Sequence, residues 1–292
     1  MNIIRSVLAR LELFNTRFNE LKKTRNVYKK RNSIILSDFN RKSRLNRVNL
    51  HYWKPVDGSD NLGDYLSTVV VNYLVPDYQN IILGGGKHLY AIGSILGFGC
   101  QDATVWGSGL LNPYPMYLER IKIANLDIRA VRGPKTRKEL IKLGKSCPDV
   151  YGDPAILMPE IYMPKDSDKI YRASLITHLS ENDKSYPIHR IDMRTNDYRH
   201  VIDEIVKSEL IISSSLHGII LAETYGVPAI LYKPSGSNLF KYEDYYESTK
   251  RKLEFIAQTV EEALKIVPME IPDFSDMREQ IRLAFPYDLW ER

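Results

Sequence analysis

One stretch, Glu209 to Tyr232, constrains the fold more than any other, because each of its boundaries is marked by residue type. Residues 210–212 form a short apolar run of the kind found in buried parallel strands. Residues 213–215 are serines that can cap a helix, and Gly226 supplies the left-handed stop at its end. Residues 229–232 then form a second strand. The stretch therefore predicts a β-α-β unit, and with it an α/β protein.

The junction between the first strand and the helix is where we expect chemistry. Free backbone N–H groups, the helix dipole and the hydroxyls of Ser213, Ser214 and Ser215 converge there, and such an arrangement holds an anion. His217 stands in the first helical turn, within reach of a bound group for proton transfer. A plain crossover helix, with capping serines and a histidine packed against a neighbour, fits the same spacing equally well.

A similar alternation of strand, small polar turn and helix precedes this unit. The first turn follows a strand at residues 50–53 and opens an apolar helix over residues 65–74. The second follows a strand at residues 81–83 and leads into a helix through Ser94, and the third follows a strand at residues 104–106. Such turns let a backbone approach a ligand closely. The candidate ligand-contacting residues in them are Asn61, Gly63, Asp64, Gly85, Gly86 and Ser108.

Two further residues stand at the predicted carboxyl ends of strands. Arg132 follows the strand at residues 128–131, and His178 ends the strand that begins at Ala173. Ligands of open parallel sheets lie at these strand ends. A guanidinium there would hold a carboxylate or a phosphate through a forked contact.

The stretch S-S-S-L-H-G-I-I-L-A-E-T-Y-G-V-P-A-I resembles the signature of the polysaccharide pyruvyl transferase family. Asn-x-Gly-Asp at residues 61–64 is similar to the N-terminal end of the same family, and the resemblance covers about residues 52–246. It implies two Rossmann-like domains similar to a GT-B-type glycosyltransferase fold. It also implies transfer of a pyruvyl group from phosphoenolpyruvate, as donor substrate without a cofactor, to a sugar. The product would be a cyclic ketal in a capsule or exopolysaccharide, or in its lipid-linked precursor.

The resemblance also implies roles for residues. His217 would do acid-base work, Arg132 would hold the donor anion, and His178 would support them. Many members carry an arginine where this chain has Ser215, so a second cation is expected from Lys241 or Arg194.

Residues 233–248 look like the loop that follows the serine-histidine unit in the family. Their tyrosines, Tyr245 among them, suit sugar recognition. Glu223, on the predicted helix, completes the expected set of substrate-contacting residues.

The net charge of +5 is unevenly divided, since the first 50 residues hold 13 Lys and Arg against 3 Asp and Glu and the remainder holds 28 against 33. Apolar residues at helical spacing from Ile3 to Leu21 predict a basic amphipathic helix there. It would dock on the protein itself or on a second subunit, or bind an anionic membrane surface through residues 1–30. The expected domains are this arm (1–48), an N-terminal Rossmann-like domain (49–164) and a C-terminal one (165–292) whose final helix returns to the first.

Several function classes lack their motifs. The sequence has no HExxH, no paired cysteines, no Walker-type phosphate loop, no G-x-G-x-x-G and no Asp-x-Asp at a convincing strand end, so we expect no metal and no nucleotide cofactor. Two cysteines, no membrane-spanning run and no base-reading motif favour a cytoplasmic protein, or one at the inner membrane face, that does not bind nucleic acid. The alternatives are a glycosyltransferase using a nucleotide sugar with Glu223 and His217, and a non-catalytic capsule-assembly protein.

Overall fold

The computed structural model describes residues 48–55, 57–76, 88–98, 102–165, 168–179, 181, 186–233 and 238–290. Within them the chain forms two four-stranded sheets in which all neighbouring strands are parallel. The predicted α/β class with parallel sheets is therefore confirmed. The predicted basic arm lies outside the described residues except for Val48, and Gly85 and Gly86 lie outside them as well.

The first sheet has the strand order β1-β2-β3-β4. Its strands are β1 (Asn49–His51), β2 (His88–Tyr90), β3 (Asp102–Trp106) and β4 (Asn125–Ala130). The helices of this half are α2 (Leu62–Leu74), α3 (Pro115–Ile123) and α4 (Pro134–Lys142). Proline opens both α3 and α4, where its missing N–H loses no helical hydrogen bond.

The second sheet has the order β6-β5-β7-β8. Its strands are β5 (Ser174–Ile176), β6 (His189–Arg190), β7 (Ile211–Ser213) and β8 (Ala229–Leu231). Its helices are α6 (Tyr198–Val206), α7 (Leu216–Thr224), α8 (Phe240–Ser248) and α9 (Val260–Ala263). The chain runs outward from β5 to β6 and then returns to the other side of β5. Ligands of open parallel sheets bind at such a reversal, here between the carboxyl ends of β5 and β7.

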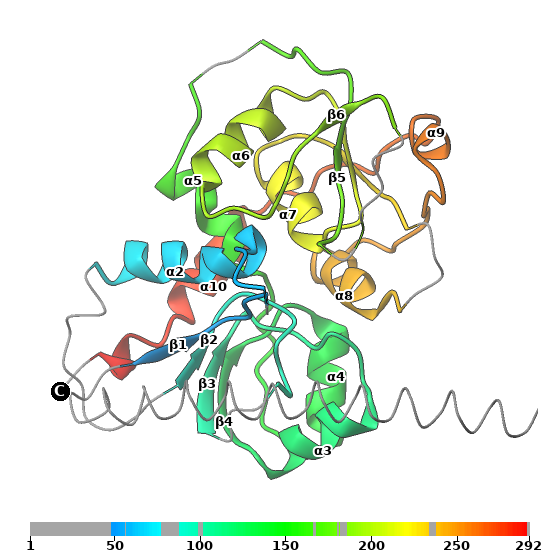
Figure 1. Cartoon of the computed structure of the whole chain (residues 1–292). Helices are drawn as coiled ribbons and strands as arrows, with labels where there is room; N and C mark the ends of the chain where they lie inside the picture. Colours follow the sequence, from blue (N-terminus) through cyan, green and yellow to red (C-terminus); the bar gives the residue numbers. More distant parts are fainter. Residues whose placement is uncertain are drawn as a thin grey trace, which may run out of the picture.

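A buried segment joins the two halves. It consists of η3 (Pro154–Leu157) and α5 (Met158–Ile161), and η3 contacts α2, α7 and the late helix α10 (Ser275–Leu283). These elements lie together between the two sheets (Figure 1). Trp106 of β3 donates its indole N–H to the Ile281 carbonyl at 2.7 Å, so α10 packs against the first sheet before the chain ends in η4 (Tyr287–Leu289). One apolar core therefore extends across both halves.

The central unit has the predicted form. Strand β7, helix α7 and strand β8 follow one another, Ser215 caps the helix, and Gly226 has a φ of +75° just beyond its end. Only a residue without a side chain adopts this conformation at little cost. This stretch is thus folded by its local sequence as well as by packing.

Other sequence predictions are wrong. The helix expected to run through Ser94 is absent from the described residues there, where β2 is followed by turns. The aromatic segment at residues 233–248, predicted to be a loop, contains helix α8. Tyr242, Tyr245 and Tyr246 lie on one buried face of that helix, and burial of their rings outweighs the modest helix propensity of tyrosine. The predicted strand at residues 187–193 is reduced to the short β6.

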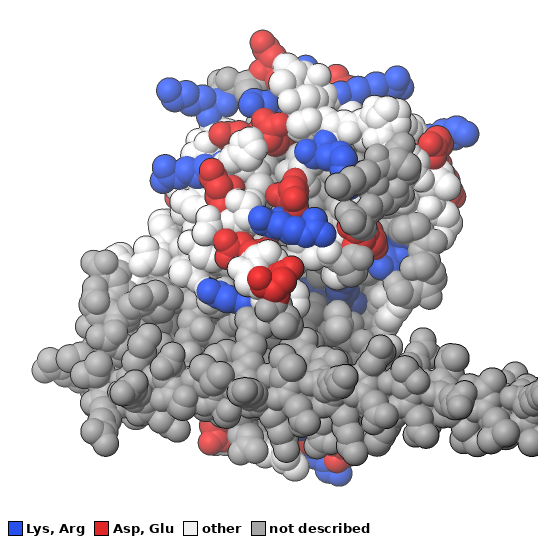
Figure 2. All heavy atoms as spheres, in the orientation of Figure 1, with Lys and Arg blue, Asp and Glu red and all other residues white. Residues whose placement is uncertain are grey.

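The visible described surface carries mixed charge. On the face shown in Figure 2, Lys and Arg side chains are interspersed with Asp and Glu side chains, without a large field of one sign. No helix within the described ranges combines the length and the apolar character that a membrane crossing requires.

Candidate active site

The turn between β7 and α7 joins the carboxyl ends of the two central strands of the second sheet. Ser213 Oγ donates to the Ile176 carbonyl at 3.0 Å, and Ser214 Oγ accepts from the His178 N–H at 2.8 Å. Ser215 caps α7 through its own hydroxyl. Each of the three hydroxyls predicted to hold an anion thus has a partner within the protein and fixes the shape of the turn. Their contact with a substrate stays a prediction.

His217 lies in the first turn of α7, between Gly63 of α2 and Asp153. A methyl group on Gly63 would come within 2.1 Å of His217 Nδ1, so the imidazole packs directly on the backbone of α2. On the other side of the ring, His217 Nε2 is 3.5 Å from Asp153 Oδ2, and the two form an ion pair when the ring is protonated. A carboxylate in this position orients an imidazole and stabilises its charged form, as a proton-transferring histidine requires.

Asp153 is a candidate functional residue that sequence reasoning missed. The sequence marks it only as part of a Gly-Asp-Pro turn, and one of its oxygens does cap η3 by accepting from the Ala155 N–H at 3.0 Å. The side chain is 1% exposed. Neither its second oxygen nor His217 Nε2 has a hydrogen-bond partner among the described residues. Capping therefore accounts for one oxygen of this carboxylate, and the other is directed to His217.

Asn61 and Asp64 bring the start of α2 to the same place. The Asn61 side-chain amide donates to one oxygen of Asp64, and the other oxygen lies so close to Gly93 that a methyl group there would come within 2.3 Å of it. Burial raises the pKa of Asp64 to about 6, with Asp153 adding to the rise while His217 and Lys241 oppose it. Asp64 is therefore a carboxyl group that exchanges a proton near neutral pH, beside the histidine.

Two lysines of the second half complete the cluster. Lys241 Nζ of α8 lies 4.9 Å from the centre of the Tyr242 ring, and Lys233 Nζ, just after β8, lies 5.8 Å from the same centre. Burial, together with the charges of Lys233 and Arg132, lowers the pKa of Lys241 to about 8, while Asp64 and Glu181 oppose the shift. Burial likewise lowers the pKa of His178 to about 4, with both lysines contributing. His178 is therefore a neutral imidazole beside two cations.

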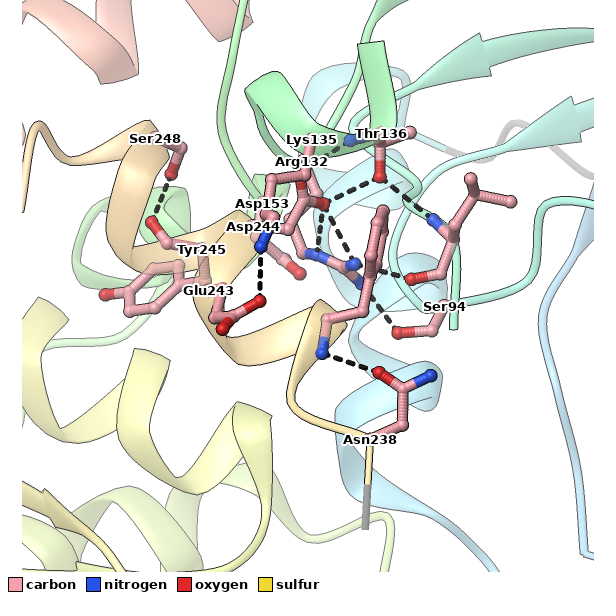
Figure 3. Close-up of polar contacts among 12 residues, drawn as sticks. Ser94, Arg132, Lys135, Thr136, Asp153, Asn238, Glu243, Asp244, Tyr245 and Ser248 are labelled. Carbon is pink, nitrogen blue, oxygen red and sulfur yellow. Dashed lines mark hydrogen bonds and ion pairs between the residues drawn. The ribbon is translucent and has the colours of Figure 1, made fainter. Parts of the chain in front are cut away.

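Arg132 lies at the carboxyl end of the first sheet, as the sequence predicts, but protein groups surround its guanidinium. It is 1% exposed and forms a buried ion pair of 2.9 Å with Asp244 of α8. It also donates to Ser94 Oγ at 2.6 Å and to the Leu110 carbonyl at 2.7 Å. Figure 3 shows Asp244 reaching both Arg132 and Thr136. This network holds α8 against the first half of the chain. Contact of Arg132 with the anion of the donor substrate stays a prediction.

Three other predicted site residues have side chains that are bonded within the protein. Ser108 is fully buried and donates to the Ala91 carbonyl at 2.9 Å. Glu223, toward the carboxyl end of α7, forms an ion pair of 2.6 Å with Arg251 and accepts from the Tyr245 hydroxyl at 2.6 Å. The structure thus joins Glu223 and Tyr245 to each other and not to the group around His217.

The cluster combines groups for proton transfer with groups for anion binding. His217, Asp153 and Asp64 bring an imidazole and two carboxyl groups together. Lys233 and Lys241 supply positive charge, and helix α7 points its amino end at the same turn. Among the described residues, no group of three or more His, Cys, Asp and Glu side chains is arranged to hold a metal ion.

Comparison with known proteins gives this cluster a context. The family model described as polysaccharide pyruvyl transferase matches residues 7–236. Succinoglycan biosynthesis protein ExoV of Rhizobium meliloti is 27% identical over 227 residues, which cover 68% of this chain and 64% of ExoV, less than two thirds of that relative. Uncharacterized protein L143 of Acanthamoeba polyphaga mimivirus is 25% identical over 215 residues, covering 68% of this chain and 73% of L143. The family match spans most of the chain, both sheets included, and the protein therefore belongs to the polysaccharide pyruvyl transferase family, as a transferase.

Proposed function

We propose that this transferase moves a pyruvyl group from phosphoenolpyruvate to two hydroxyls of a saccharide, forming a cyclic ketal during exopolysaccharide or capsule synthesis. Family membership and the printed name of the succinoglycan relative support the reaction class. The observation that carries the proposal is the position of His217, which pairs with buried Asp153 at the turn where Lys233 and Lys241 gather. Proton transfer and binding of an anionic donor are the two demands of this reaction.

The reaction balances as follows. A proton adds to the methylene carbon of phosphoenolpyruvate, and the first sugar hydroxyl forms a bond to the adjacent carbon while giving up its proton. The bond from that carbon to the phosphate oxygen then breaks, and the second hydroxyl takes the place of phosphate and loses its proton. One hydroxyl proton is thus balanced by the new methyl group and the other by the phosphate released.

The geometry supports a division of roles. His217, oriented by its contact with Asp153, would exchange protons with the reacting groups. Asp64, whose pKa is raised to about 6 by burial, would act as a second proton carrier beside it. Nothing in the described structure favours a glycosyltransferase that uses Glu223, because Arg251 and Tyr245 occupy that carboxylate.

The same proposal covers the saccharide acceptor and contact with a membrane. The saccharide must offer two hydroxyls close enough to close a five- or six-membered ketal ring, and a lipid-linked precursor would meet this need. Membrane contact through residues 1–30 remains a prediction, because those residues lie outside the described ranges.

The test is a donor-dependent assay on the full chain. Phosphoenolpyruvate is incubated with a panel of saccharides that carry free diols, and released phosphate and acid-labile pyruvate on the saccharide are measured together. His217→Gln should lower kcat by about 10²- to 10⁴-fold, the usual contribution of an acid-base group. His200→Gln, on an exposed position of α6, is the matched control and should leave turnover unchanged. Turnover that survives His217→Gln would contradict the proposal, and phosphate release without pyruvate on the saccharide would contradict ketal formation.

A further inference from the structure

We propose that Lys233 and Lys241, held against the ring of Tyr242, form the binding site for a phosphate group. In the proposed reaction, on which this assignment rests, the group is the phosphate of the donor. The two ammonium groups come from different elements, the end of β8 and the first turn of α8, and both face one ring. The full negative charge of a phosphate matches such a pair of cations.

Two carboxylates of the described residues act on the lysine pair, those of Glu181 and Asp64. Glu181 lies 3.9 Å from Lys233 Nζ, and its other oxygen accepts from the Ser214 hydroxyl. Lys241 has no ion-pair partner among the described residues. The two ammonium groups repel each other, and a bound anion would relieve that repulsion.

Helix α8 has acidic residues that could have neutralised Lys241, but they are held elsewhere. Glu243 pairs with Lys135 and Asp244 pairs with Arg132, both in the first half of the chain (Figure 3). A methyl group on Gly133 would come within 1.9 Å of the Asp244 carbonyl oxygen, so the backbone of α8 also rests directly on that turn. The helix is thus fixed in an orientation that separates its carboxylates from its lysine.

The pair is also fixed relative to the rest of the site. The Tyr242 hydroxyl donates to the Ser214 carbonyl at 2.8 Å, which ties the ring under both lysines to the turn before α7. His217 lies three residues further along that turn and helix. A phosphate on the lysines would therefore lie near the proton-transferring group and at the amino end of α7. Such a place suits a leaving phosphate, whose charge grows as its bond to carbon breaks.

The site predicts pH-dependent binding. Besides each other, the lysines face Arg132 from the turn after β4, Asp64 from α2, and His178 and Glu181 from the segment after β5. Since the pKa of Lys241 is about 8, the affinity for sulfate, which keeps its charge across this range, should fall as pH rises through about 8. In Lys241→Gln this fall should be absent.

The direct test uses inorganic phosphate and sulfate as probes, with binding followed by calorimetric titration and by Tm. Lys233→Gln and Lys241→Gln should each weaken binding by about tenfold, and the double variant should abolish the ligand-induced rise in Tm. Without ligand, the variants should melt at or above the Tm of the wild-type protein, because removing one lysine relieves repulsion. Lys252→Gln, at an exposed position, is the control and should bind like the wild type.

The outcomes separate this site from the proposed reaction. Binding that is unchanged in the double variant, or that is lost equally in Lys252→Gln, would overturn the site. If phosphoenolpyruvate supports turnover and its KM is unchanged in the double variant, the reaction stands and the site is wrong. If phosphate binds through the lysines but no saccharide accepts pyruvate, the site stands as an anion site and the reaction is wrong.

Discussion

Arg132 belongs to the first half of the chain and Lys241 to the second, and the two cations have different surroundings. Arg132 is 1% exposed, and its guanidinium forms an ion pair with Asp244 and donates hydrogen bonds to Ser94 and the Leu110 carbonyl. Lys241, in reach of the field of Arg132, has a ring beneath it and no carboxylate paired with it in the described structure. A cation whose bonds are all made within the protein holds the fold, whereas one left without a counter-charge is available to a ligand.

The largest effect should come from breaking the buried pair. Arg132→Met leaves Asp244 buried without its cation, and the loss of one partner of such a pair typically costs about 3 to 5 kcal/mol. At roughly 2 to 4 °C per kcal/mol, the Tm should fall by about 10 °C. Thermal unfolding of the full chain measures this directly.

Arg129 supplies the matched control, since it lies on β4, three residues before Arg132, and pairs with the carboxylates of Asp127 and Asp288. Its side chain is 36% exposed, so Arg129→Met should cost about 1 kcal/mol or less. Equal losses in the two variants would show that Arg132 is no more structural than a surface arginine, and the comparison with Lys241 would fail.

Asp64 tests the surroundings of Lys241, because its charge acts on Lys241 although the two form no ion pair. The pKa of Asp64 is about 6 in the folded protein and 3.8 in the unfolded chain. The protonated carboxyl group therefore adds to the free energy of unfolding in full below pH 3.8, and this contribution is lost as pH rises through about 6. Asp64→Asn cannot ionise and keeps that contribution. At neutral pH the variant should therefore exceed the wild type by up to roughly 3 kcal/mol.

Melting curves of both proteins between acidic and neutral pH provide the measurement. The two Tm values should agree at the acidic end and diverge across the range from about 4 to 6. Parallel curves for Asp64→Asn and the wild type would mean that this carboxyl group is not held in the buried setting described above.

The smallest effect on stability is expected at the exposed edge of the contact between α4 and α8. Lys135 pairs with Glu243 and lies 3.9 Å from Glu247, but these side chains are 30%, 37% and 45% exposed. Lys135→Gln should therefore cost about 0.5 kcal/mol, a change in Tm of about 2 °C or less. A loss as large as that of Arg132→Met would show that charge at the junction matters regardless of burial.

The sequence was a good guide wherever local chemistry decides the structure. The strands and helix around His217 follow from an apolar run, capping serines and a glycine stop, and they stand where expected. Helix α8 was missed because its aromatic residues have modest helix propensity alone, and only the tertiary contacts of Tyr242 and Tyr245 bury that face.

The site was predicted in part, and the misses share one cause. Residues within one turn, such as Asn61 and Asp64, could be grouped from spacing alone. Asp153 reaches the cluster from a distant part of the chain. Lys233 directly follows the central unit, but nothing in its spacing showed that its ammonium group would share the ring of Tyr242 with Lys241. Arg132 was placed correctly just beyond the carboxyl end of its strand, but its partner Asp244 is 112 residues away, which spacing could not show.

The contact of His217 with Gly63 has a consequence for engineering. The histidine is encoded in the second half of the chain, but its ring rests on backbone from the first half at a distance that admits no side chain. Exchange of halves between two members of the family would therefore transplant a histidine without the surface that supports it. A working chimera would need α2 and α7 to come from the same parent, and directed evolution of new acceptors is better confined to loops that leave this pair of helices intact.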